Sequence, residues 1–259
     1  DTDGTVHGLL LATPAGVGVL RCATVVDATG CAEVAAHAGA ATEHIDADHV
    51  AIQGTGLGPR QLGDRYRNTD WTFVDDTDVV DTTHAQVQAR HKWPDEFDLS
   101  SLIDSRERRR IRGVVRVSPL DQLSGRTWPD TIVTALSNFD THGMTVHPIF
   151  AVEPMDKTPL DAHVPLRALC TRELRNVLTT GLGKCAHRDA LPVIRMQADV
   201  QNEGYAAGVA GATAARGAGD VHRLDVAALQ AHLVEVGLLP GLFGEDQVRH
   251  VNRIEGTTE

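Results

Sequence analysis

Two short apolar runs at the start of the chain are separated by a turn-forming segment. Residues 6–12 and 17–22 are rich in Val and Leu, and the tetrapeptide Thr-Pro-Ala-Gly occupies residues 13–16. Proline presets one backbone dihedral and glycine accepts unusual ones. The pattern therefore predicts a β-hairpin.

Two β-branched segments predict short buried strands that end in small residues. Residues 24–26 (Thr-Val-Val) run into Asp-Ala-Thr-Gly, and residues 176–180 (Asn-Val-Leu-Thr-Thr) run into Gly-Leu-Gly. Ligands of open α/β sheets bind outside the carboxyl ends of the strands, where a glycine removes the Cβ that would block a cofactor. The alternative is an ordinary strand-to-helix turn without a ligand.

Helical patterns account for much of the remaining chain. Helices are expected over residues 32–38, 82–92, 194–216 and 225–236, and a strand over 111–118. In the longest helix Gly204, Gly208 and Gly211 share one face. Each costs about 0.8–1.0 kcal/mol relative to Ala, so we expect close contact of that face with a strand or a cofactor, tight packing on a sheet without a ligand being the alternative.

Charge density, proline and all three Trp residues are concentrated in the middle of the chain. This shift predicts an inserted α+β substrate (cap) domain over residues 41–161. Residues 1–40 and 162–240 would form the other domain, and 241–259 a peripheral tail.

Composition narrows the function classes. The net charge of -11 argues against a nucleic-acid partner, and no apolar run is long enough to span a membrane. The four cysteines form no Cys-x-x-Cys pair, so neither a zinc site nor a disulfide framework is indicated. With no basic or apolar leader at residue 1, we expect a soluble cytoplasmic protein acting on a small molecule.

Several polar side chains are candidates for catalysis or substrate binding. His187 precedes the long helix, and an imidazole that titrates near pH 6.5 suits general acid–base chemistry. Arg188 and Asp189 would position an anionic or hydroxylated substrate, or else pair with each other at the surface. The other substrate candidates are His142, His147 and, from an Arg-rich run, Arg109 with Arg106 and Arg110. Ordinary loop histidines and a solvated charged face are the alternatives for these. No metal site is expected.

Four motifs in order resemble the FAD-dependent oxidoreductase family of the glutathione-reductase-like flavoprotein superfamily. They are Val25-Val26-Asp27-Ala28-Thr29-Gly30 with Ala35–Ala40, Arg106–Gly113, Val164–Leu169 with Asn176–Gly181, and Ala186–Leu191 with Arg195-Met196-Gln197 and Gln201–Gly208. The resemblance implies an α/β fold with a discontinuous, Rossmann-like FAD/NAD(P)-binding domain.

The resemblance also implies where FAD would lie. It places Ala28, Thr29 and Gly30 along the cofactor. Gly181 and Gly183 would lie near the diphosphate or ribityl chain, and Arg195, Met196 and Gln197, at the start of a helix, near the ring. A helix amino terminus carries about half a positive charge, which favours anionic reduced flavin.

This chain departs from the family pattern in two respects. Cys31 and Glu33 stand where Asp is commoner. The Gly-x-Gly-x-x-Gly loop expected near the amino terminus is absent, and residues 54–58 (Gly-Thr-Gly-Leu-Gly) indicate a surface loop, because Pro59 follows them.

We therefore expect the carboxy-terminal part of a flavoenzyme that moves a hydride from a small organic substrate to flavin. An upstream segment or a separate chain would supply the phosphate-binding loop. The alternatives are a flavin-free, non-catalytic remnant and a carbohydrate-acting, lyase-like protein that uses His187 and Asp189 as acid and base.

Overall fold

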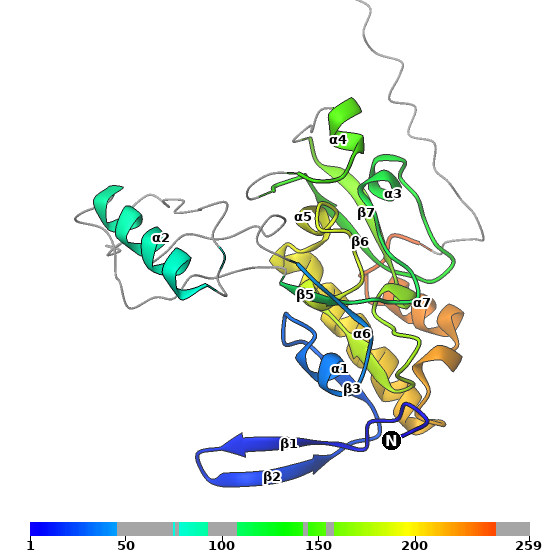
Figure 1. Cartoon of the computed structure of the whole chain (residues 1–259). Coiled ribbons are helices and arrows are strands. Elements are labelled where there is room, and N and C mark those ends of the chain that lie inside the picture. Colours follow the sequence, from blue (N-terminus) through cyan, green and yellow to red (C-terminus); the bar gives the residue numbers. More distant parts are fainter. Residues whose placement is uncertain (46–74, 76–77, 93–107, 142–144, 154–157, 242–259) are drawn as a thin grey trace, which may run out of the picture. The chain divides into compact units, whose positions relative to one another are not determined.

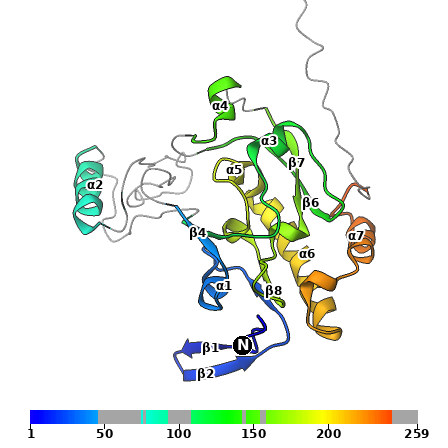
Figure 2. The ribbon, with the colours of Figure 1, turned by 45° about the vertical axis from the view of Figure 1, so that its right-hand side comes forward.

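The structure is a computed structural model, and it describes residues 1–45, 75, 78–92, 108–141, 145–153 and 158–241. The chain divides into two compact units. Unit 1 comprises Asp1–Glu43, Arg109–Phe139 and His147–Glu259, and unit 2 comprises His44–Arg108 and Asp140–Val146. Figures 1 and 2 show the elements from two directions.

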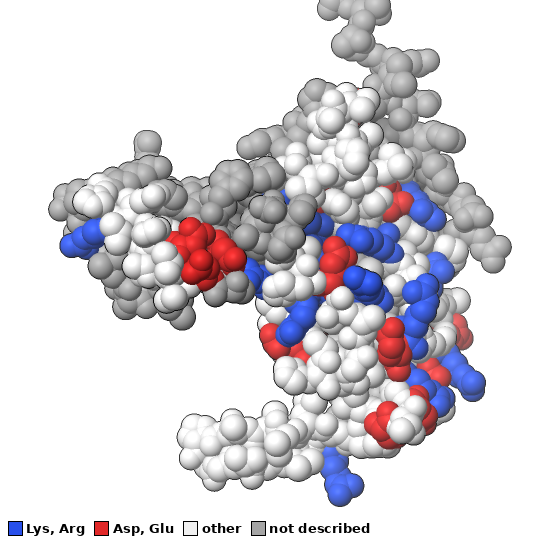
Figure 3. All heavy atoms as spheres, in the orientation of Figure 1, with Lys and Arg blue, Asp and Glu red and all other residues white. Residues whose placement is uncertain are grey.

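The expected hairpin is confirmed. Strand β1 (Gly8–Thr13) pairs antiparallel with β2 (Gly16–Arg21), and Leu10 lies opposite Val19. Both faces of this two-stranded ribbon carry exposed apolar side chains. Leu10 on one face is 74% exposed, and Leu20 on the other face is 55% exposed. In Figure 3 the ribbon is almost free of charged atoms apart from its base.

The two buried strands with small-residue ends are also confirmed, and they pair with each other. Strand β3 (Val25–Asp27) runs parallel to β8 (Val177–Thr179). Asp27 lies opposite Thr179, so the carboxyl ends of both strands meet at one edge. Helix α1 (Glu33–His37) follows β3, and the 3₁₀ turn η2 (Gly181–Gly183) follows β8.

The strand expected over residues 111–118 is wrong in extent. Strand β5 (Arg109–Ile111), which pairs with β4 (Thr42–His44), ends early, and Gly113 and Val117 form only isolated bridges. A Cβ at Gly113 would lie 2.7 Å from Cys185 Cβ and 2.9 Å from Cys170 O, so the close packing there leaves room only for glycine. Ser118 then starts helix α3 (Pro119–Leu123) through a capping box with Asp121.

A further two-stranded sheet and a set of short helices complete the core of unit 1. Strand β6 (Thr131–Ser137) pairs antiparallel with β7 (Leu160–Pro165). The short elements are α4 (Ile149–Val152), η1 (Leu166–Ala168), α5 (Leu191–Ile194) and η3 (Val221–Arg223). One apolar cluster joins side chains of β6, β7, β8, α5, α6 and α7.

Helix α6 (Gln197–Arg216) is the central helix of this unit, and it contacts β3, β8, β6 and helix α7 (Val226–Glu235). The expected contact of the glycine face with a strand is found at one of its three glycines. A Cβ on Gly204 or Gly208 would meet nothing within 4 Å, and only Gly211 packs against β3, near Val26. The buried face is built from alanines instead: Ala206, Ala207, Ala210 and Ala214.

In unit 2 the described residues form helix α2 (Val79–Lys92), which begins three residues before the expected helix. The unit boundaries differ from the predicted ones, because Arg109–Phe139 and residues 147–161 cluster with unit 1. Of the helices that the structure describes, none combines the length and apolar character needed to cross a membrane.

Candidate functional site

The predicted cofactor residues come together at the shared edge of β3 and β8. Gly30 (φ 84°) and Gly181 (φ 67°) both adopt the left-handed backbone conformation that favours glycine. A Cβ on Gly30 would meet no atom within 4 Å, and one on Gly181 only Val200 Cγ1 at 3.9 Å. The two strand ends therefore leave open space against their backbone.

Asp27 organises the turn that carries residues 28–30. Its side chain is 1% exposed and accepts three hydrogen bonds: from Thr29 N (3.1 Å), Thr29 Oγ1 (2.7 Å) and Ala35 N (2.9 Å). Thr29 Oγ1 in turn accepts from Glu33 N at 2.9 Å. One carboxylate thus fixes both the end of β3 and the start of α1.

The turn also contains a strained residue that contacts the second strand end. Ala32 has φ 51° and ψ 42°, and it is the one non-glycine residue with positive φ in the described part of the chain. A Cβ on Gly183 would lie 2.9 Å from Ala32 N and 2.9 Å from Thr179 Cγ2. The glycine at position 183 is therefore required by packing between the two turns.

The amino end of α6 lies beside Gly181. Val200, in the first turn of α6, approaches Gly181, and Glu203 Oε1 accepts a hydrogen bond from Gly181 N at 2.7 Å. Met196 is the N-cap residue, and no side chain caps the helix there. The first amides of α6, with the positive end of the helix dipole, can therefore bind an anionic group.

Four of the predicted substrate residues form a second cluster. The rings of His147 and His187 make an edge-to-face contact, with centroids 4.9 Å apart at 88°. Asp189 Oδ2 accepts from His147 N at 2.7 Å, and its Oδ1 accepts from Arg188 Nη1 at 2.8 Å. Arg188 and Asp189 do pair, but they are 4% and 0% exposed rather than at the surface.

The pKa of His187 is lower than the value near 6.5 expected of an ordinary imidazole. Burial, together with Arg116, His147 and Arg110, lowers its pKa from 6.5 to about 4 despite the opposing charge of Asp189. Its Nδ1 accepts a hydrogen bond from Asp189 N at 3.1 Å. The neutral ring therefore carries its proton on Nε2, where it acts as a hydrogen-bond donor near neutral pH.

His187 is close to the strand-end cluster along the chain. It follows Gly183 by four positions, so the two Cα atoms lie within about 14 Å of each other. Its backbone N donates to Val117 O at 2.7 Å, which fixes the loop to the segment before α3.

Arg109 lies at the turn after β3 rather than with the histidines. Its Nε donates to Cys31 O at 2.9 Å, and its Nη2 lies 2.5 Å from Glu33 Oε2. Arg110 is buried and donates from Nη1 to Ala186 O, so it is not a solvated charge, whereas the Arg109 side chain is 26% exposed. Arg106, His142 and residues 54–58 lie outside the described residues.

One buried pair was not anticipated from the sequence. Lys184 and Glu203 form an ion pair in which both side chains are 0% exposed. The signal was present, because Lys184 is the one charged residue between positions 176 and 186 in an otherwise apolar and small-residue segment. Within the described residues, no group of three or more His, Cys, Asp or Glu side chains is arranged to hold a metal ion.

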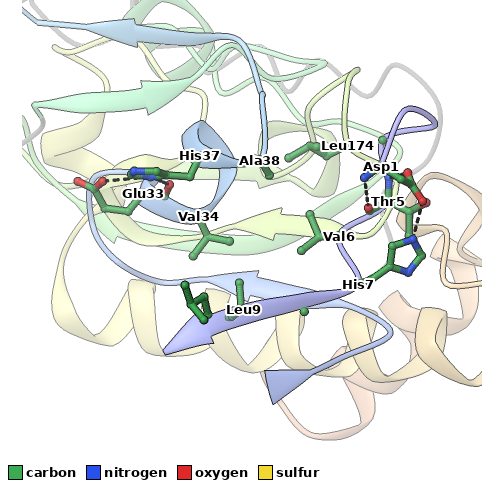
Figure 4. A pocket seen from close by; sticks show the side chains of 13 residues that line it. Asp1, Thr5, Val6, His7, Leu9, Glu33, Val34, His37, Ala38 and Leu174 are labelled. Carbon is green, nitrogen blue, oxygen red and sulfur yellow. Dashed lines mark hydrogen bonds and ion pairs between the residues drawn. The ribbon is translucent and has the colours of Figure 1, made fainter. Parts of the chain in front are cut away.

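The structure also has a cleft of about 710 Å³ between β1 and α1 (Figure 4). Leu9, Val34 and Leu174 line its apolar part, while the pairs Glu33–His37 and Asp1–His7 lie at its rim. None of the predicted cofactor or substrate residues lines this cleft.

Comparison with known proteins identifies the family. The sequence model of the family described as "FAD dependent oxidoreductase" matches residues 64–233, which is more than half of the 259-residue chain. No curated protein matches, and no solved structure matches. The matched range includes Gly181, Gly183 and residues 195–197, whereas residues 28–30 precede it. The chain belongs to the FAD-dependent oxidoreductase family, whose fold is Rossmann-like α/β and whose cofactor is FAD.

Proposed function

We propose that the edge formed by β3, β8 and the amino end of α6 is part of the FAD site. The observation that carries this proposal is the meeting of two open glycine turns, at Gly30 and Gly181, with an uncapped helix amino terminus. Strand ends of a parallel pair are where dinucleotides bind in α/β sheets. The residues present therefore fit the cofactor that the family uses.

In this proposal each group of the chain has a physical task. When bound, FAD accepts a hydride from a small organic substrate. Gly30 and Gly181 let the cofactor approach the backbone, and Gly183 keeps the two turns in contact. The amides that start α6, after Arg195 and Met196, stabilise negative charge on the cofactor's ring system.

We assign His187 a binding role rather than an acid–base role. Its Nδ1 is held by Asp189 N, and its Nε2–H would donate a hydrogen bond to a substrate oxygen. Arg188 and His147 hold Asp189 in place from two sides. A neutral donor that keeps its proton also gives little support to the lyase-like alternative, which needs His187 to exchange protons.

Titration of the purified chain with FAD tests the proposal. Gly30→Leu should abolish quenching of flavin fluorescence. Gly237→Leu is the matched control, since Gly237 also has positive φ (78°) and open space around it, but lies at the end of α7. Both variants place leucine at a positive φ and carry the same kind of backbone strain, so a difference in their FAD affinity would come from a cofactor at β3. Equal affinities for FAD would contradict the assignment.

A partner is part of the proposal. A segment or separate chain with a Gly-x-Gly-x-x-Gly loop would supply further phosphate contacts, and the complex would act on a small molecule in the cytoplasm. Adding that segment should raise FAD affinity. If the protein bound no FAD with or without it, the flavin-free alternative would be preferred. Formation of unsaturated sugar without an electron acceptor would favour the lyase-like alternative.

A further inference from the structure

The Lys184–Glu203 pair is completely buried and makes more contacts than the ion pair itself. Lys184 Nζ donates to Glu203 Oε2 and, at 2.7 Å, to the carbonyl oxygen of Ile194. The other carboxylate oxygen of Glu203 accepts from Gly181 N at 2.7 Å. The two side chains therefore connect three points of the backbone: Gly181, Ile194 and, on α6, Glu203 itself.

These three points frame the proposed FAD site. Gly181 starts the turn η2, whose residues 181–183 follow β8. Ile194 ends α5 and immediately precedes residues 195–197 at the start of α6. Glu203 lies about two turns further along α6. The contacts of Lys184 and Glu203 thus set the spacing between two segments that both belong to the proposed cofactor contacts.

Stability alone is a weak reason for such a pair. Removing two charges from water is costly, and well-packed apolar residues often replace a buried ion pair without loss of stability. Buried ionic groups can instead select one geometry among several. Here the geometry selected is that of η2 against α6.

We propose that Lys184 and Glu203 are positioning residues that hold the Gly181 amide and the start of α6 in the arrangement that FAD requires. This inference rests on the proposed function. Neither side chain is exposed, so they act through the backbone that they hold. The hydrogen bond from Gly181 N to Glu203 is the contact that transmits the effect.

Two double variants isolate that hydrogen bond. In Lys184→Met/Glu203→Gln both charges are removed, but the Gln side-chain oxygen can still accept from Gly181 N. In Lys184→Met/Glu203→Leu both charges and the acceptor are removed. Each variant loses the Lys184–Ile194 contact equally, so the two differ mainly at Gly181.

Two measurements distinguish positioning from a general structural role. Hydrogen exchange of the Gly181 amide, measured by NMR without FAD, should be as slow as wild type in the Gln variant and at least about tenfold faster in the Leu variant. FAD affinity should be near wild type in the Gln variant and about tenfold weaker in the Leu variant, with similar thermal midpoints.

The outcomes separate this inference from the proposed function. Equal exchange rates and equal FAD affinities in both variants would overturn the positioning role. Loss of folding in the Leu variant alone, with unaltered exchange in its folded fraction, would also overturn it and indicate a structural role. If wild-type protein bound no FAD, the proposed function would fail, while the Gly181 exchange rates would still decide whether the pair fixes η2.

Discussion

Replacing Asp27 by Asn should destabilise the protein by more than its change in size suggests. Asp27 is 1% exposed, and its two carboxylate oxygens have different partners. Oδ1 accepts from Thr29 N and Oγ1, and Oδ2 accepts from Ala35 N at 2.9 Å. An Asn oxygen can keep the Thr29 contacts. Its NH₂ group would then face Ala35 N, so two donors oppose each other in a buried site.

The loss of one charge-assisted hydrogen bond and the unsatisfied amide together cost about 2–3 kcal/mol. With an m-value of about 3 kcal/mol/M, the urea midpoint should fall by roughly 0.7–1 M. Asp225→Asn is the control, because Asp225 caps α7 at an exposed site by accepting from Ala228 N. Asn caps helices as well as Asp does, so that change should stay below about 0.5 kcal/mol. Equal midpoints for the two variants would refute the reasoning about Asp27.

Three further changes test other features. His187→Asn keeps an acceptor for Asp189 N. The pKa of His187 falls from 6.5 to about 4 on folding, so between these pH values the unfolded wild-type chain binds this proton and the folded chain does not. In urea titrations, wild type should therefore lose more stability than the variant as the pH falls from 6.5 to 4. Gly208→Ala should stabilise the chain by about 0.8–1.0 kcal/mol in thermal unfolding, since its Cβ meets open space; destabilisation would show that this face is covered. Gly183→Ala should cost about 1–3 kcal/mol, because its Cβ would press on the Ala32 backbone; an unchanged midpoint would contradict that contact.

Local signals in the sequence predicted the elements whose geometry depends on near neighbours. The hairpin, β3 and β8 follow from turn residues and β-branched runs. The resemblance to the family implies that both glycine turns lie along one cofactor, and the parallel register of β3 with β8 brings the two strand ends to the same edge.

Tertiary packing decided the features that the sequence did not predict. A strand is expected over residues 111–118, but β5 ends at Ile111, and Gly113 packs closely against Cys185, more than seventy positions away in the chain. The pKa of His187 depends on burial, which residue type does not reveal. The spacing of the α6 glycines alone predicts a packed glycine face, whereas the buried face contains Gly211 together with alanines.

The pairing of β3 with β8 also has a consequence for synthesis of the protein. Thr180 donates to Asp27 O across 153 positions of the chain, so the first half of the site exists long before the second. At 5–20 residues per second, a ribosome needs roughly 8–30 s to add that length. During this time the β3 segment has no native partner strand, and pairings between such distant segments form slowly. At the proposed site, cofactor capture during translation therefore has to wait until β8 and α6 have emerged.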